Sequence, residues 1–314
     1  MNEDPHIHDK FIQAILSDRK IAGDYFRNFL PEFVSKHLDF SSITQLPNSY
    51  LSDELKKTMS DIVYTCNKKD GSDTVKVSLL IEHKSYPDKN VAIQIGSYIF
   101  SALQMQVRNK EPLSIVVPVL LYHGKMRWKY RSLGDLFESL EDGWRAFLPD
   151  FKYIYNDLGA LADEEIEALD NNFLAASFLT LKHSVEKKWI EQNAAVLLLL
   201  ASKEQRGLRR QFIIYLSGRG EFKEKALNSL PPSIKQEVMN TLDIYTEKRR
   251  KEGFEEGIQK GMEKGIEQGK EEKGFDIVEN LINKLGLDDQ QAAEIAEVPV
   301  SFVLKVRKTL CKKK

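Results

Sequence analysis

The stretch VKVSLLIEHKSYPD, residues 75–88, decides the fold that this sequence predicts. Apolar residues alternate along its first half, which predicts a strand with one apolar face. Glu82 and Lys84 end that strand two positions apart, so their side chains project from the same face. Charges at the end of an apolar strand are costly unless they have a function. The stretch therefore predicts a sheet strand and a candidate site together.

The flanking segments complete an α/β pattern. Before the stretch, the β-branched run 61–65 predicts a strand, and Asp70-Gly71 is a hairpin signal. After it, residues 88–108 carry apolar side chains at helical spacing. The apolar run 114–122 then predicts a covered central strand, in which Pro118 suggests a bulge. This order predicts an α/β sandwich with a mixed sheet flanked by helices.

Four regions follow from changes in composition. We predict an α/β core at 1–130 and a mainly helical extension of it at 131–250. A repeat with glycine at every fourth residue occupies 251–274, and a small helical tail occupies 275–314. The chain of 314 residues is long enough for this organisation.

Composition restricts the class of protein. Hydrophobic residues make up 42% of the chain, so extensive disorder is excluded. The net charge of −1 means that a nucleic-acid-binding protein would need local basic patches. The two cysteines lie far apart without a CxxC motif, which argues against a disulfide framework or a zinc site. The polar start and the short longest apolar run, 194–201, predict a cytoplasmic protein with no membrane segment.

The two carboxylates and the lysine suit phosphodiester hydrolysis. If the strands 61–65 and 75–84 pair as a hairpin, Asp61 lies beside Glu82 and Lys84. Mg²⁺ (or Mn²⁺) prefers carboxylate oxygens, and the backbone carbonyl of His83 offers a further ligand. The lysine can orient the attacking water and stabilise the transition state. The alternative interpretation is an ordinary exposed Glu/Lys pair at a strand end, because short motifs are only hypotheses.

Six segments, in this order, resemble one known family: HDKF (8–11), FLPEFV (29–34), LDFSSI (38–43), SDIVY (60–64), LLIEHKSYPD (79–88) and PVLLYHGKMRW (118–128). They are similar to the recombination-promoting nuclease (Rpn) or "putative transposase" (YhgA-like) family of the PD-(D/E)XK nuclease superfamily. The resemblance covers roughly residues 6–250. It implies a restriction-endonuclease-like core at 1–130, with Asp61 and Glu82 as metal ligands and Lys84 as the motif lysine.

The resemblance also assigns residues on the neighbouring helices. Gln94 and Tyr98 match the QxxxY helix of related nucleases, where these residues contact DNA or order the site. Gln94 is thereby implied as a catalytic residue and Tyr98 as a DNA-binding one. Asp9 is either a helix cap or an extra ligand from the first helix. The histidines His6 and His8 precede it, and we interpret them as terminal residues rather than metal ligands.

Basic residues alternate directly after the run 114–122. Lys125, Arg127, Lys129 and Arg131 share one face if the segment is extended, which predicts a phosphate-contact strip for DNA. A solvated edge strand guarded by lysines explains the same pattern equally well. A second, weaker patch comprises Arg206, Arg209 and Arg210.

Glycine recurs every four residues in the repeat, at Gly253, Gly257, Gly261, Gly265 and Gly269. Each glycine inside a helix costs roughly 1 kcal/mol relative to alanine, so an isolated helix here would be weak. A partner helix packed closely against the glycines would compensate. We interpret the segment as a helix for homo-oligomerisation, with a flexible connector as the alternative.

The tail predicts three short helices. The first covers Phe275 to Leu285 and ends at Gly286, and Asp288 caps the second. The third runs from Val300 to Leu310 in a basic context. This pattern is typical of a helix-turn-helix that contacts DNA or of a small protein-interaction bundle.

Taken together, the sequence predicts a Mg²⁺-dependent DNA endonuclease whose products promote DNA recombination. A protein that keeps the fold as a catalytically silent DNA-binding or oligomeric scaffold is the alternative. A transposase using an acidic triad is a third hypothesis, for which the sequence offers no convincing third acid.

Overall fold

The computed structural model describes residues 7–46, 62–70, 77–137 and 139–312, with backbone alone for 77–83, 142 and 312. The chain forms two compact units, Met1–Leu242 and Asp243–Lys314. Both the mixed α/β class and the helical C-terminal region predicted from the sequence are confirmed. None of the described helices is long and apolar enough to cross a membrane.

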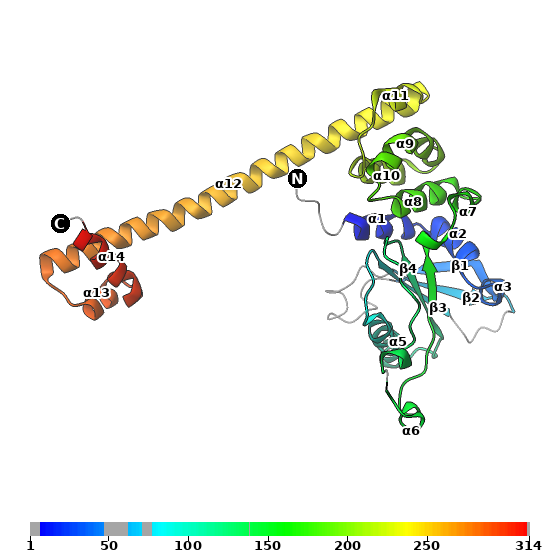
Figure 1. Ribbon diagram of the computed structural model, residues 1–314, viewed down its shortest axis with the longest axis horizontal. Coiled ribbons are helices and arrows are strands. Elements are labelled where there is room, and N and C mark those ends of the chain that lie inside the picture. Colours follow the sequence, from blue (N-terminus) through cyan, green and yellow to red (C-terminus); the bar gives the residue numbers. More distant parts are fainter. Residues whose placement is uncertain (1–6, 47–61, 71–76, 138, 313–314) are drawn as a thin grey trace. The chain divides into compact units, whose positions relative to one another are not determined.

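A mixed five-stranded sheet forms the centre of the first unit, with its strands in sequence order (Figure 1). The strands are β1 (Leu38–Gln45), β2 (Ile62–Lys68), β3 (Val77–Lys84), β4 (Val116–Tyr122) and β5 (Ile154–Asp157). Strands β1 to β3 pair antiparallel, which confirms the predicted hairpin, whereas β4 and β5 continue parallel to β3. The parallel step from β3 to β4 requires a crossover, which α5 (Val91–Arg108) supplies.

Helices precede the sheet and follow it. Those before the sheet are α1 (Ile7–Leu16), α2 (Arg19–Phe29) and α3 (Glu32–His37). Two 3₁₀ turns, η2 (Gly134–Leu136) and η3 (Leu158–Ala160), lie on either side of β5. The described helices that follow are α6 (Asp142–Arg145), α7 (Asp163–Glu167), α8 (Asn172–Lys182), α9 (Lys187–Ala201), α10 (Arg206–Ser217) and α11 (Glu224–Asn228), and α12 (Pro232–Leu285) also begins in this unit.

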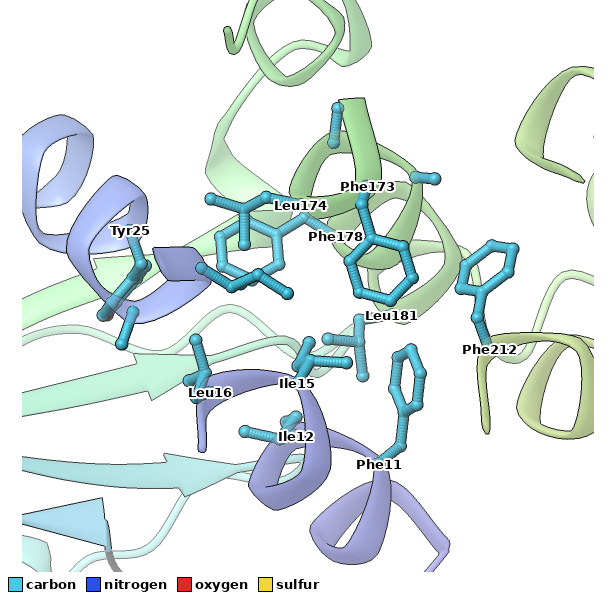
Figure 2. Packing of buried hydrophobic residues seen from close by; sticks show 14 of the residues in the cluster. Phe11, Ile12, Ile15, Leu16, Tyr25, Phe173, Leu174, Phe178, Leu181 and Phe212 are labelled. Carbon is cyan, nitrogen blue, oxygen red and sulfur yellow. The ribbon is translucent and has the colours of Figure 1, made fainter. Parts of the chain in front are cut away.

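The two faces of the sheet bury different helices because side chains alternate along β4. Val119 and Leu121 belong to a large cluster with residues of α1, α2, α8 and α10, part of which Figure 2 shows. Leu120 points to the other face and packs with Val91 and Ile95 of α5. The sheet is therefore covered on both sides, which explains the continuous apolar run in β4.

Two strands were not predicted from the sequence. Strand β1 buries Leu38, Phe40 and Ile43, so its apolar spacing is two and then three residues. The irregularity is a shift in register between Asp39 and Thr44, which a search for strict alternation misses. Strand β5 has four residues, all half-buried, and therefore carries no hydrophobic pattern.

Three local predictions were wrong. Pro118 causes no bulge, because the β3–β4 register continues unshifted through its pair with Leu80. The ladder between β4 and β5 begins only at Val119, so Pro118 has no partner strand on that side. Proline has no N–H to donate, and this position tolerates it because no strand there needs that hydrogen bond. Asp9 lies inside the first turn of α1 and is not its cap. The segment 123–133 is irregular rather than an edge strand.

The glycine repeat is helical. It lies within α12 (Pro232–Leu285), a helix of 54 residues. Gly286 ends this helix at a φ of +66°, and hydrogen bonds from Gly286 N to Ile282 O and from Leu287 N to Leu281 O close its last turn. This confirms the predicted termination.

The second unit has its own small core. Asp288 caps α13 (Asp289–Ile295) in a capping box with Gln291, as predicted. Helix α14 (Val300–Lys312) follows. Buried residues from the end of α12 and from both later helices form the cluster, namely Val278, Leu281, Ala292, Ala293, Val303 and Val306.

Candidate active site

Glu82 and Lys84, two of the predicted site residues, lie at the end of β3. Strand β2 starts at Ile62, which pairs with Ile81, and Glu82 follows Ile81 in β3. Asp61 itself lies outside the described residues, as do the side chains of Glu82 and His83. The backbones of Glu82 and His83 pair with Leu120 and Leu121 of β4. Beyond Ile81, the end of β3 is therefore held by its pairing with β4.

Lys84 is the last residue of β3, and its side chain is only 13% exposed. Its Nζ lies 3.3 Å from Oδ2 of Asp88, whose side chain is 26% exposed. Its backbone oxygen accepts a hydrogen bond from His123 N at 3.1 Å. The ammonium group is thus held at the strand end by a carboxylate that the sequence reasoning did not assign to the site.

The second predicted pair lies on α5. Gln94 Nε2 donates a hydrogen bond to Tyr98 Oη at 3.1 Å. Tyr98 is fully buried, whereas Gln94 is partly exposed. The resemblance implies that these residues contact DNA or order the site. A fully buried ring has no surface to offer to DNA, so this geometry favours the second role for Tyr98, in which it positions Gln94.

Helix α1 contacts the residue that follows the end of β4. The rings of His8 and His123 lie 5.1 Å apart, and His123 directly follows β4. His8 Nδ1 also lies 2.6 Å from Tyr215 Oη. His8 is therefore a packed residue of the fold, and Asp9 is its neighbour in α1. His6 lies outside the described residues.

Gly124 allows the chain to turn tightly next to the end of β3. A Cβ at this position would collide with the backbone oxygen of Ser85 and the hydroxyl of Tyr122. The segment after β4 thus passes directly over the residue that follows Lys84. This close approach explains why glycine stands between the buried His123 and the exposed Lys125.

Three tyrosine hydroxyls bind the basic segment to the sheet. They donate from Tyr122 to Met126 O (2.6 Å), from Tyr155 to Trp128 O (2.8 Å) and from Tyr153 to Arg131 O (2.7 Å). The predicted contact residues Lys125, Arg127 and Lys129 are all exposed, as is Arg131. The loop therefore has an anchored backbone and outward basic side chains, although it is not a strand.

These tyrosines keep their protons. Burial raises the pKa of all three phenols above the ordinary value, and the nearby Asp157 carboxylate raises the pKa of Tyr122 and Tyr155 further. Their hydroxyls therefore remain hydrogen-bond donors at neutral pH.

Several charged side chains of the first unit pair within it, and Lys125 of the basic loop is one of them, with its Nζ 3.5 Å from Glu186 Oε1. Arg209, from the second predicted basic patch, forks onto Glu237 at 2.9 and 3.0 Å. Asp163 accepts hydrogen bonds from Lys182 at 2.6 Å and from His183 at 2.9 Å. Burial raises the pKa of Asp163, but these two bonds outweigh it and leave that pKa below its ordinary value. Arg209 is thus committed to a structural ion pair.

Both cysteines are free, as expected from their separation. Cys66 is buried and Cys311 is exposed. Burial raises the pKa of the Cys66 thiol, which keeps it protonated and unreactive. Among the residues whose side chains are described, no three His, Cys, Asp or Glu residues cluster as a metal site. Asp61 and Glu82 are not part of that set.

The profile of one protein family, "Putative transposase, YhgA-like", matches residues 6–209. The chain belongs to this family. The matched range contains the whole sheet, the crossover helix α5 and, on the other face, α1, α2 and α8, and it ends within α10. No solved structure matches the chain significantly.

Several relatives from Escherichia coli are similar to this YhgA-like chain. "Inactive recombination-promoting nuclease-like protein RpnE" of strain K12 is 26% identical over 56% of the chain and 58% of the relative. "Recombination-promoting nuclease RpnD" of O157:H7 is 26% identical over 51% of the chain and 61% of the relative. "Recombination-promoting nuclease RpnC" of K12 is 27% identical over 61% of both proteins. The match thus spans about three fifths of the length of these curated relatives.

Proposed function

We propose that this chain is a metal-dependent DNA endonuclease whose products promote recombination. The observation that carries the proposal is the register of β2 and β3, in which Ile62 pairs with Ile81. Asp61 precedes the first of these residues in the sequence, and Glu82 follows the second. The two acids and Lys84 are thus assigned to one end of the antiparallel hairpin, as phosphodiester hydrolysis requires.

The fold supports the proposal. The order of elements is helix, three antiparallel strands, crossover helix and parallel strand. This order agrees with the PD-(D/E)XK core that the resemblance implies. The names of RpnC and RpnD, both recombination-promoting nucleases, point to the same class of activity.

The available ligands fit a hard divalent cation. Asp61, Glu82 and the carbonyl of His83 offer oxygen atoms only, and the described residues supply no competing His or Cys cluster. When bound, Mg²⁺ (or Mn²⁺) would lower the pKa of a coordinated water and neutralise charge on the phosphoryl group. We assign no other cofactor to this site.

The described residues supply positioning. Asp88 holds the Lys84 ammonium at the end of β3, where it can donate to the phosphate or orient the attacking water. Tyr98 holds Gln94 in the same way on α5. Lys84 and Gln94 thus each have a buried or partly buried neighbour that fixes the direction of the side chain before DNA binds.

The anchored loop supplies the contact with DNA. Lys125, Arg127, Lys129 and Arg131 lie on the segment that starts next to Ser85. Contacts between basic side chains and phosphates position the duplex without reading its sequence. These residues provide the local positive charge that a chain of net charge −1 needs.

A plasmid assay tests the proposal. We expect wild-type protein to nick supercoiled DNA in Mg²⁺ and to lose that activity in EDTA. Asp61→Ala and Glu82→Ala should each reduce cutting by at least 100-fold, because each removes a metal ligand. Asp150→Ala, an exposed acid outside the site, is the control and should cut normally. Persistent cutting by both site variants would show that the assignment is wrong.

A second candidate function is a silent DNA-binding protein with the same fold. The name of RpnE, an inactive nuclease-like protein, favours it. It predicts that wild-type protein retards DNA in a gel but does not cut it in Mg²⁺ or Mn²⁺. The retention of both acids and the lysine in this chain favours the enzyme instead.

A further inference from the structure

A shallow pocket of about 350 Å³ lies between the start of α2 and strand β1. These two elements contact each other in the first unit (Figure 1). The side chains that decide its chemistry are Arg19, Lys20 and Arg27 of α2, Phe40 of β1 and Gln205, the residue before α10. The pocket therefore combines three basic residues with one aromatic ring.

A glycine of α2 keeps the pocket open. Arg19, Gly23 and Arg27 are four residues apart, so they lie along one face of the helix. Within 4 Å, a Cβ on Gly23 would meet only the guanidinium nitrogens of Arg27 among the described residues, at an ordinary contact distance of 3.8 Å. Packing therefore does not require glycine here, and glycine is a poorer helix former than alanine. Its effect is to leave the space between the two arginines unfilled.

The pocket has an excess of positive charge. Its one carboxylate, Asp18, caps α2 by accepting hydrogen bonds from Lys20 N at 2.9 Å and from Ile21 N at 3.1 Å. Arg19 donates a hydrogen bond to the backbone oxygen of Ser41. Among the described residues, no carboxylate forms an ion pair with Arg19 or Lys20. Two cations of the pocket are thus not neutralised by an acid in the described part of the chain.

Arg27 is the third cation of the pocket. One of its nitrogens binds Asp24 Oδ1 at 2.5 Å, and its guanidinium lies 5.4 Å from the centre of the Phe40 ring. The side chain is nevertheless 52% exposed. A guanidinium has five N–H donors, so the bond to Asp24 leaves Arg27 able to donate to a ligand in the pocket.

The positive charge continues beyond the pocket. Lys203 and Arg206 lie on either side of Gln205 in the sequence, and both are exposed. Neither forms an ion pair within the residues that the structure describes. Arg209, further along α10, pairs instead with Glu237. The second basic patch predicted from the sequence is therefore divided, since Arg206 adjoins the pocket whereas Arg209 belongs to the fold.

The pocket is separate from the candidate active site. Phe40 follows Asp39, which pairs with Asn67 near the end of β2. The candidate site lies at the other end of β2, where Ile62 pairs with Ile81. Four to five residues of strand separate the two places, which is about 15 Å at about 3.3 Å per residue. A ligand in the pocket therefore does not occupy the candidate active site.

We propose that this pocket binds backbone phosphates of DNA, as a second contact away from the place of cutting. The inference rests on the proposed function, because it takes DNA as the substrate. The cations extend outside the hollow to Lys203 and Arg206, which fits a long polyanion better than a small phosphate compound. One duplex is long enough to reach both places, since about 15 Å corresponds to about five base pairs. Contacts of this kind position DNA without reading its sequence.

Fluorescence anisotropy with a labelled duplex of about 30 base pairs tests the contact in EDTA, where metal-dependent cutting does not occur. The double substitution Lys20→Gln and Arg206→Gln should raise the Kd of the full chain about tenfold. It should also lower the slope of log Kd against log salt concentration by about 2, because two phosphate contacts are lost.

A second double variant is the control for net charge. Lys188→Gln with Lys225→Gln removes the same charge from exposed residues outside the pocket and should leave both the Kd and the slope nearly unchanged. Equal effects in the two double variants would overturn the proposal, because net charge alone would then explain the binding.

Cross-linking tests whether DNA lies at the pocket itself. In a Cys311→Ser background, Lys20→Cys and Lys225→Cys proteins each carry an azidophenacyl group, because the remaining cysteine, Cys66, is buried. Irradiation should link the duplex to the label at position 20 and not to the label at position 225. ATP at the same phosphate concentration should not prevent the link. Prevention by ATP, or no link at position 20 in a protein that binds DNA, would contradict the proposal.

This inference and the proposed function fail in different ways. If wild-type protein neither binds nor cuts DNA, the proposed function is wrong and the second contact is wrong with it. If wild-type protein cuts DNA while the pocket variants behave like the control variants, only the second contact is wrong.

Discussion

Lys84 and Asp88 form a partly shielded ion pair at the end of β3. Their side chains are 13% and 26% exposed, and 3.3 Å separates Nζ from Oδ2. A pair with this little exposure is screened less than a surface pair, although some of its attraction is still lost to solvent. Its importance is therefore geometric, since Asp88 determines where the lysine points.

We expect Asp88→Asn to slow DNA cutting about tenfold, equivalent to about 1.4 kcal/mol of barrier, because the amide holds the ammonium less firmly. Plasmid nicking rates in Mg²⁺ would measure the effect, and Asp88→Glu should recover part of the loss. Thermal unfolding monitors the fold in parallel. An unchanged rate in Asp88→Asn would remove Asp88 from the positioning of Lys84.

At this scale the sequence predicts strand residues better than loop residues. Glu82 and Lys84 follow from the two-residue period of β3, which fixes their common face. Asp88 lies four positions after Lys84 in an irregular segment, where no period applies. Its only signal was its place in the segment LLIEHKSYPD, whose resemblance to the family includes it.

The end of α12 depends on one glycine with a left-handed backbone. Gly286 has a φ of +66°, and its N–H closes the last turn of α12. Any other L-residue pays about 1 kcal/mol for this conformation because its Cβ crowds the backbone. Glycine at this position therefore stabilises the reversal that brings α13 and α14 against α12.

Gly286→Ala should destabilise the second unit by about 1 kcal/mol. Urea unfolding followed by circular dichroism would measure the change. Gly207→Ala in α10 is a matched control, because a Cβ there also meets no atom within 4 Å but its φ is not positive. Equal effects at the two glycines would contradict the role of the left-handed backbone.

Elements with a regular pattern were predictable, and those without one were not. Strands β3 and β4, the crossover helix α5 and the cap at Asp288 were anticipated from period and turn chemistry. Strand β1 was missed because its bulge breaks the alternation, and Asp39 stabilises that bulge. Its carboxylate accepts hydrogen bonds from the hydroxyl and amide of Ser41, which lower the pKa of Asp39.

Two separate hydrophobic cores divide the whole molecule. The cluster of the second unit contains Val278 and Val306, both fully buried, and it shares no residue with the clusters of the first unit. Separate cores unfold separately unless their interface couples them. All three tryptophans of the sequence lie in the first unit, at positions 128, 144 and 189.

Circular dichroism and tryptophan fluorescence should therefore report different unfolding transitions. Val306→Ala removes two buried methyl groups and should destabilise the second unit by about 1.5 to 3 kcal/mol. Its urea midpoint should fall when measured by circular dichroism but stay constant when measured by tryptophan fluorescence. Leu197→Ala in the core of the first unit should move the fluorescence midpoint instead. Coincident shifts in both probes would indicate one cooperative unit.

The glycine helix is the place where the chain is most open to proteolysis. A helix with few stabilising contacts opens readily, and an open segment is a substrate for proteases. Residues 243–273 contain eight lysines and arginines at which a trypsin-like protease can cut. Cleavage there would separate the C-terminal helices from the first unit while leaving both hydrophobic cores intact.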